Sequence, residues 1–224
     1  MVGVRIREAI RFAGRPDSRT EGGKAVERCL ALELVSTIRH DGDGGVADDL
    51  ATLQGTARWI RERGSDLAAG VTVDENLRSE VVALRQAVRA LFAHSVSPGP
   101  PSPADAHRLM PVDRALARLN AAAGREPVAP QLDWPSGGTP APRLLSAEKD
   151  PHLRLVAALA RAAIDFLTGP QREDLRACAA PRCVRYFVKK HGRQEWCKPS
   201  CGNRARAARH YRRHAAADTD PSRP

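Results

Sequence analysis

The chain has 224 residues and a mass of 24.3 kDa, enough for one large domain or for a medium domain with a small second one. Hydrophobic residues make up 42% of it and aromatic residues only 4%, so the core has to be aliphatic and rich in alanine. These values are typical of an ordinary soluble protein, and they favour packed helices over sheets.

The net charge of +10 is concentrated in one segment of the chain. Between Cys178 and His214, eleven Lys or Arg residues stand against a single acid, Glu195, whereas the rest of the chain holds 25 basic and 25 acidic residues. Charge that served only solubility would be spread over the surface. The segment is therefore expected to bind a polyanion.

Neither an export signal nor a membrane span is expected. Charged residues at positions 5, 7, 8 and 11 interrupt the N-terminal stretch, and no part of the chain approaches the roughly 18 uncharged apolar residues of a membrane helix. The sequence thus predicts a soluble cytoplasmic protein without a membrane partner. In that reducing compartment, thiol pairs are more often metal ligands than disulfides.

The first half of the chain reads as a series of helices. A flexible leader is expected over residues 1–24, followed by a core helix between 24 and 40 that ends at the glycine-rich stretch 41–45, and by a second helix over 50–63. The clearest helix covers residues 72–96, where Thr72 and Glu75 have the spacing of a capping box. The proline-rich segment that follows breaks the chain.

The second half continues with a helix over 112–122 and a small β-hairpin around the Ser-Gly-Gly sequence at 136–138. The next helix, 151–168, has Asp150 as N-cap, Pro151 at its first position and Gly169 as stop signal.

A domain boundary near residue 170 completes the division. The predicted fold is mainly α: a helical domain over 25–170 with a small β-hairpin, a four-cysteine zinc finger over 171–216 that ends in a basic helix, and a disordered tail over 217–224.

Four of the five cysteines form two close pairs separated by a loop: Cys178, Cys183, Cys197 and Cys201. Two such pairs can direct four sulfurs at one ion, as in a tetrahedral zinc site with sulfurs at about 2.3 Å from the metal. The segment has too few large apolar side chains to fold alone, so a metal cross-link has to substitute for a core. We expect one structural zinc ion.

Other roles for these cysteines remain open. Two disulfides would need an oxidising compartment, a redox pair usually has two residues between its cysteines, and four thiolates could also hold an iron–sulfur cluster. The histidines at 191, 210 and 214 are expected at the surface or at phosphates, because four thiolates already fill a tetrahedron. Cys29 is expected to be an inert core thiol.

The stretch "WCKPSCGNRARAARHYRRH" resembles the CGNR zinc-finger family of bacterial regulators, named for the tetrapeptide at 201–204. "CAAPRCVRYFV" is similar to the family's first cysteine pair and the aromatic strand after it. The preceding 170 residues, with "CLALELVSTIRH" and "DDLATLQGTARWI", resemble the ABATE domain found with this finger, which is described as a stress-induced transcription regulator. Glu33 stands where an acid of the first helix is expected, whereas the loop between the cysteine pairs lacks the Asp-x-Ser piece that many members have.

The sequence after Cys201 predicts a basic helix. Arg206, Arg209 and Arg213 share one face, and Ala207, Ala208 and Tyr211 share another, while Asn203 is expected to cap the helix. Because guanidinium forks suit phosphates and guanine edges, this helix can bind DNA. The expected nucleic-acid contacts are Arg204, Arg206, Arg209, Arg212, Arg213, Lys189, Lys190 and Arg193.

Two functional hypotheses follow. In the first, the chain is a DNA-binding, nucleoid-associated transcription regulator whose N-terminal domain senses a small-molecule effector or a partner, with a homodimer left open. In the second, it is a nucleic-acid binder without sequence preference that contacts RNA or the ribosome. An enzyme is not expected, because the chain has no deaminase, Walker or nucleophile-elbow motif, and four thiolates leave zinc no open position for water.

Overall fold

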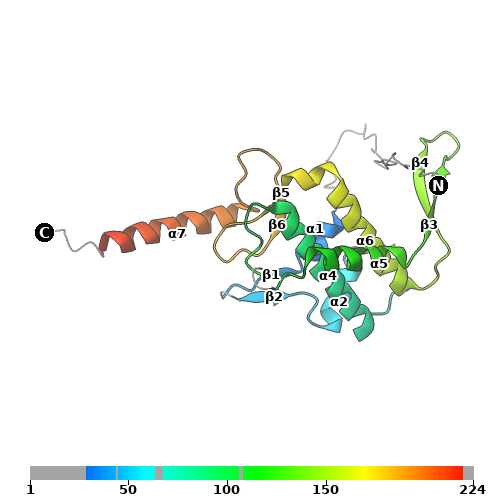
Figure 1. The fold of residues 1–224 in the computed structure, drawn as a ribbon, viewed down its shortest axis with the longest axis horizontal. Coiled ribbons are helices and arrows are strands. Elements are labelled where there is room, and N and C mark those ends of the chain that lie inside the picture. The colour runs from blue at the N-terminus through cyan, green and yellow to red at the C-terminus, as the bar shows by residue number, and fades with distance from the viewer. Residues whose placement is uncertain (1–28, 44, 64–67, 106–107, 219–224) are drawn as a thin grey trace, which may run out of the picture. The chain divides into compact units, whose positions relative to one another are not determined.

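The computed structural model describes residues 29–43, 45–63, 68–105 and 108–218 (Figure 1). The leader expected over residues 1–24 and the last residues of the expected tail lie outside this part. Contacts divide the chain into two units, of which the larger comprises Arg28–Pro127 and Glu148–Pro224, and the smaller includes Val128–Ala147. The larger unit contains both the helical core and the cysteine-rich segment.

The larger unit begins with a short helix and a hairpin: α1 (Leu30–Val35), β1 (Ile38–His40) and β2 (Val46–Asp48). The helix expected up to residue 40 is therefore wrong in its second half. The Thr37 hydroxyl donates to the carbonyl of Leu34 at 2.7 Å, and the Asp41 carboxylate accepts two backbone N–H groups of the following turn. Side chains that bond to the local backbone in this way compete with a helix and favour a turn.

Two helices follow, α2 (Leu53–Arg61) and α4 (Glu75–Val96). The second helix confirms the clearest prediction of the sequence, but its N-cap is Asp74, whose carboxylate accepts the Leu77 N–H at 2.7 Å. The capping box predicted from Thr72 is therefore wrong, because Thr72 lies two residues before the cap. The Glu75 side chain pairs with Arg78 instead.

The helices α5 (Val112–Gly124) and α6 (Pro151–Thr168) complete the core. In α6 the predicted signals are confirmed: the Asp150 carboxylate accepts the His152 N–H at 2.8 Å, Pro151 opens the helix and Gly169 ends it. A 3₁₀ turn, η1 (Pro170–Asp174), leads to the last segment. Over the residues that the structure describes, we find no helix with the length and apolarity that crossing a membrane requires.

The central element of the core is α4, which packs against α1, α5 and α6 (Figure 1). Its apolar stripe, including Leu77, Val81 and Leu84, is fully buried, as the sequence period predicts. Near its C-terminal end, Phe92 stacks against Phe166 of α6 at a ring distance of 5.0 Å. Few aromatic side chains are available, and these two lie within the aliphatic core.

The cysteine-rich segment contributes a hairpin and a long helix: β5 (Leu175–Ala177), β6 (Tyr186–Val188) and α7 (Pro199–Asp218). Leu175 and Tyr186 are buried in the same core as the helices, and the Tyr186 ring meets the Phe92 ring edge-on at 5.7 Å. The hairpin of the finger is thus packed into the helical core and is not a separate module joined to it by a linker.

The smaller unit contains the antiparallel hairpin β3 (Val128–Asp133) and β4 (Ala141–Ser146). Gly137 adopts a φ of 76° in its turn, a conformation that favours glycine. This is the hairpin that the Ser-Gly-Gly sequence predicts. The mainly α fold class with small hairpins and a terminal four-cysteine segment is confirmed.

Candidate metal centre and basic helix

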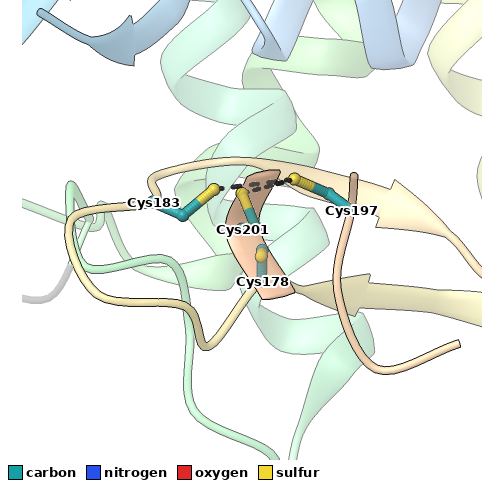
Figure 2. Close-up of side chains that lie close together, drawn as sticks. All are labelled: Cys178, Cys183, Cys197 and Cys201. Carbon is teal, nitrogen blue, oxygen red and sulfur yellow. Dashed lines mark hydrogen bonds between the residues drawn. The ribbon is translucent and has the colours of Figure 1, made fainter. Parts of the chain in front are cut away.

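The four predicted ligands come from two turns and one helix end. Cys178 directly follows β5, and its N–H donates to the Arg185 carbonyl at 2.9 Å. The N–H of Cys183 donates to the Ala180 carbonyl at 3.0 Å and thereby closes a turn. On the other side, Cys197 precedes α7 and Cys201 lies in its first turn. Two local bends therefore present two sulfurs each to the same point (Figure 2).

The sulfur geometry fits a tetrahedral ion. All four Sγ atoms lie within 4.8 Å of one another, with 3.7 Å between Cys183 and Cys197 and 3.5 Å between Cys197 and Cys201 (Figure 2). A tetrahedron with metal–sulfur bonds of about 2.3 Å has edges of about 3.8 Å. The distances thus match those expected around zinc.

The pKa values of the cluster reflect the close approach of its sulfurs. Hydrogen bonds from Cys178 and Cys197 lower the pKa of Cys183 to about 3. The same close sulfurs, Cys178 and Cys183, raise the pKa of Cys197 far above its usual range. Four thiolates at this separation repel one another unless a dication lies between them. These cysteines hold one structural zinc ion, and because all four positions are taken by sulfur, the site stabilises the fold and does not activate water.

Two residues of the Cys-Gly-Asn-Arg tetrapeptide support the metal site. The Arg204 Nη2 donates to the Cys201 Sγ at 3.2 Å, which places this predicted nucleic-acid contact against a ligand sulfur. At Gly202 a Cβ atom would lie 3.0 Å from Cδ1 of Trp196, so glycine lets the indole pack on the helix. The predicted cap Asn203 lies inside α7, which starts earlier at Pro199, and its Oδ1 accepts a hydrogen bond from Arg206.

A buried polar network joins the metal site to the helical core. The Arg89 guanidinium forms a two-pronged ion pair with Asp105 at 2.7 and 3.0 Å, and it donates to the carbonyls of Val35 and Val184. Tyr186 donates its hydroxyl to Asp105 at 2.8 Å, and Ser102 donates to Val184. Val184 directly follows the ligand Cys183, so the network fixes one cysteine pair against α4.

This network was not predicted from the sequence. The sequence holds one indication of the network, because Arg85 and Arg89 lie four residues apart on the otherwise apolar face of the helix at 72–96. An arginine on a core-facing stripe needs a buried acid as partner. The acidic partner of Arg85 is Asp48 of β2, with which it forms a two-pronged ion pair. Burial opposes ionisation of this carboxyl, but the hydrogen bond and charge of Arg85 outweigh burial and lower the pKa of Asp48.

The basic face of α7 is present as expected. An open hollow of about 440 Å³ lies on this face, lined by Glu195, Trp196, Arg206, Arg209, His210 and Arg213.

The other predicted nucleic-acid residues lie elsewhere. Lys189 donates to the Gly192 carbonyl at 3.1 Å, and Lys190 and Arg193 are exposed in the loop before Trp196. The Nε of Arg212 donates to the Ala208 carbonyl one turn earlier in α7. The exposed histidines His210 and His214 contact one another. Cys29 is the residue before α1 and packs partly against the core.

The fold and the site define a helical protein that carries a C-terminal four-cysteine zinc finger. The ABATE family profile, described as "Putative stress-induced transcription regulator", matches residues 29–170, and the CGNR zinc finger profile matches residues 175–214. The chain belongs to the ABATE family and bears a CGNR zinc finger, and it is a zinc-binding regulator. No curated protein matches the chain.

Proposed function

We propose that this zinc-binding regulator binds DNA through α7. The observation that supports the proposal best is the hollow on the basic face of the helix, where exposed Arg209 and Arg213 make no side-chain hydrogen bond or ion pair with any described residue. Exposed guanidinium groups without acid partners are available for phosphates and base edges. The zinc site fixes the first turn of the same helix and thereby orients this face.

The proposal predicts a salt-dependent interaction. Each arginine–phosphate pair releases counterions, so the slope of the logarithm of the affinity against the logarithm of the salt concentration changes by about 0.9 for each pair that a substitution removes. The double variant Arg209→Gln/Arg213→Gln of the zinc-loaded full chain should bind duplex DNA more weakly and with a slope shallower by about 1.8. Fluorescence anisotropy at several salt concentrations measures both quantities.

A matched control removes the same charge elsewhere. Arg58 and Arg114 are exposed on α2 and α5, and neither side chain bonds to another described residue. Arg58→Gln/Arg114→Gln should leave the salt slope unchanged. If the two double variants bind DNA equally well, α7 is not the DNA-binding element.

Regulation further requires sequence preference. Selection from random duplexes should return a common motif, because arginines in a groove can read guanine edges. If RNA competes better than duplex DNA and no motif is found, the chain is instead a general nucleic-acid binder. Tyr211, which is 73% exposed on α7, could then stack on unpaired bases. A catalytic role is not part of the proposal, because four thiolates leave the zinc no open position.

The proposal also assigns effector sensing to the helical domain. A cleft of about 680 Å³ lies between the β1–β2 hairpin and α4, lined by apolar side chains such as Val82 and by polar groups that include Gln86 and Arg108. A mixed lining of this kind suits a small molecule. Native mass spectrometry of protein purified from its own cells should detect a bound compound, and Val82→Trp, which fills the cleft, should remove it. If wild type and variant carry the same compounds or none, the cleft is not the sensor.

A further inference from the structure

A second basic hollow lies away from the α7 face, where the β1–β2 hairpin meets the zinc finger. It has a volume of about 350 Å³ and is lined by residues from two segments far apart in the sequence. The hairpin contributes Arg39, His40 and Asp41, and the finger contributes Arg185, Lys198 and Arg204. Both segments belong to the larger unit of the chain.

Most of the charged side chains in the lining are cations. Arg185 and Lys198 make no side-chain ion pair or hydrogen bond within the described part of the chain. Arg39 pairs with Asp49 at 2.8 Å and remains 46% exposed. The single acid of the lining, Asp41, is already engaged by the backbone N–H groups of its own turn. Four cations therefore line this hollow, together with the carboxylate of Asp41 and the zinc-ligand sulfur of Cys183, and two of these cations, Arg185 and Lys198, have no partner in the described part of the chain.

Two buried donors of the lining have no acceptor. His40 accepts the Gly42 N–H on Nδ1 at 2.7 Å, so in the neutral ring the proton lies on Nε2, and this buried atom has no hydrogen-bond partner. The Nε of Arg204 is likewise buried without a partner, although its Nη2 donates to Cys201. These two residues and the unpaired cations Arg185 and Lys198 line the same hollow, and such a set of N–H donors suits an anion that only accepts hydrogen bonds.

We propose that this hollow binds a phosphate group between the hairpin of the helical domain and the zinc finger. Phosphate offers acceptor oxygens in several directions, as groups that converge from two segments require. The phosphate belongs either to a nucleic-acid backbone or to a small phosphorylated molecule. Only the first source depends on the function proposed above.

The test uses inorganic phosphate as probe and the zinc-loaded full chain. Isothermal titration at constant ionic strength should show saturable binding to wild type, and Arg185→Gln/Lys198→Gln should weaken it at least tenfold. The matched control Lys190→Gln/Arg193→Gln removes two exposed cations of the same finger outside the hollow and should change the affinity less than threefold. The zinc content of each variant verifies that the finger has folded. If the double variant loses zinc, the single variant Lys198→Glu, at an exposed position, is measured in its place.

The source of the phosphate is determined in a second arm. If inorganic phosphate at constant ionic strength displaces duplex DNA from wild type but not from Arg185→Gln/Lys198→Gln, the group belongs to the nucleic-acid backbone. Phosphate binding without displacement, or in a chain that binds no DNA, assigns the hollow to a phosphorylated small molecule. The inference is overturned if wild type binds no phosphate saturably, or if variant and control bind it equally.

Discussion

The buried arginines of α4 and the exposed arginines of α7 occupy opposite environments. Arg85 and Arg89 are only 3% and 4% exposed, and each forms a two-pronged ion pair with an aspartate. On α7, Arg209 and Arg213 are exposed and bond to no described residue. The difference shows that a positive charge enters this core only with an aspartate as its partner, whereas the excess charge of the chain is left on an exposed helix face whose hollow holds one acid, Glu195.

The two sets also depend on different supports. The buried arginines are held by α1, β2, the segment after α4 and the finger hairpin, whereas the α7 arginines depend on one zinc ion at the start of their helix. Perturbing each support in turn should therefore affect one set more than the other. The following changes are ordered by the size of the expected effect.

Removing a zinc ligand should have the largest effect and should act on α7. Zinc binding contributes roughly 10–16 kcal/mol of apparent free energy in small finger modules. Cys201→Ser should reduce the zinc content from about one equivalent per chain to nearly none and abolish duplex binding, while the helical core keeps its far-UV circular dichroism. Cys29→Ser, a thiol outside the cluster, should retain zinc. Equal zinc content in both variants would contradict the assigned ligands.

Arg89→Met should be the most damaging change in α4. It leaves the Asp105 carboxylate in the interior without its cation, and breaking a buried ion pair in this way costs about 3–5 kcal/mol. Urea unfolding followed by circular dichroism measures the decrease in free energy of unfolding. The control Arg114→Met removes an exposed arginine of α5 and should change stability by no more than about 0.5 kcal/mol. A similar decrease in both variants would show that the network adds nothing.

A smaller decrease in stability is expected from Tyr186→Phe, which removes one hydroxyl from the same network. Asp105 is deprived of the hydroxyl donor at 2.8 Å but keeps Arg89, and the Ser102 N–H is deprived of its acceptor at 3.2 Å. Leaving such groups unsatisfied costs about 1–3 kcal/mol. Burial and the Asp105 charge raise the pKa of Tyr186, so the wild-type hydroxyl donates throughout the neutral range and the decrease should not vary between pH 6 and 8. Urea unfolding at both pH values tests this.

The features of the two sets that could be predicted from the sequence are those that depend on residues close together in the chain. The thiolate cluster followed from cysteine spacing, and the basic face of α7 from helical periodicity, because both depend on neighbours in the sequence. The α4 network combines Val35, Arg89, Asp105 and Val184, which meet only in the folded core. Sequence alone could flag the arginines on an apolar stripe but could not identify their partners.

Element boundaries show the same limit. The apolar pattern around Ile38 fits a helix as well as a strand, and the β1–β2 pairing with Val46–Asp48 decided between them. Likewise Pro199, which is favoured at the first position of a helix, moved the start of α7 ahead of Cys201 and made Asn203 an interior residue. Competing local signals of similar strength were thus resolved by pairing with the next strand in one case and by a proline at the helix start in the other.

Mild acid should separate the two supports. The neighbouring sulfurs raise the pKa of Cys197 in the metal-free cluster, so zinc has to displace at least this proton and its affinity falls at least about tenfold for each unit of pH lowered. The pKa of Asp48 is lowered from 3.8, so its ion pair with Arg85 stabilises the fold above that value and disappears only as the pH falls below it. Between pH 7 and 5, a chromogenic chelator should therefore remove zinc increasingly while the urea midpoint of the helical core stays nearly constant.

The smallest effect on stability is expected from Arg209→Gln, and it is the strictest test of the comparison. This side chain bonds to no described residue, so the free energy of unfolding should change by no more than about 0.5 kcal/mol, against the 3–5 kcal/mol expected for Arg89→Met. Binding should respond in the opposite order: Arg209→Gln makes the salt slope of duplex binding shallower by about 0.9, because one phosphate is no longer neutralised. Stability by urea unfolding and affinity by anisotropy on the same preparation give both values. If Arg209→Gln instead destabilises the chain, the α7 arginines are structural and their exposure does not mark a binding surface.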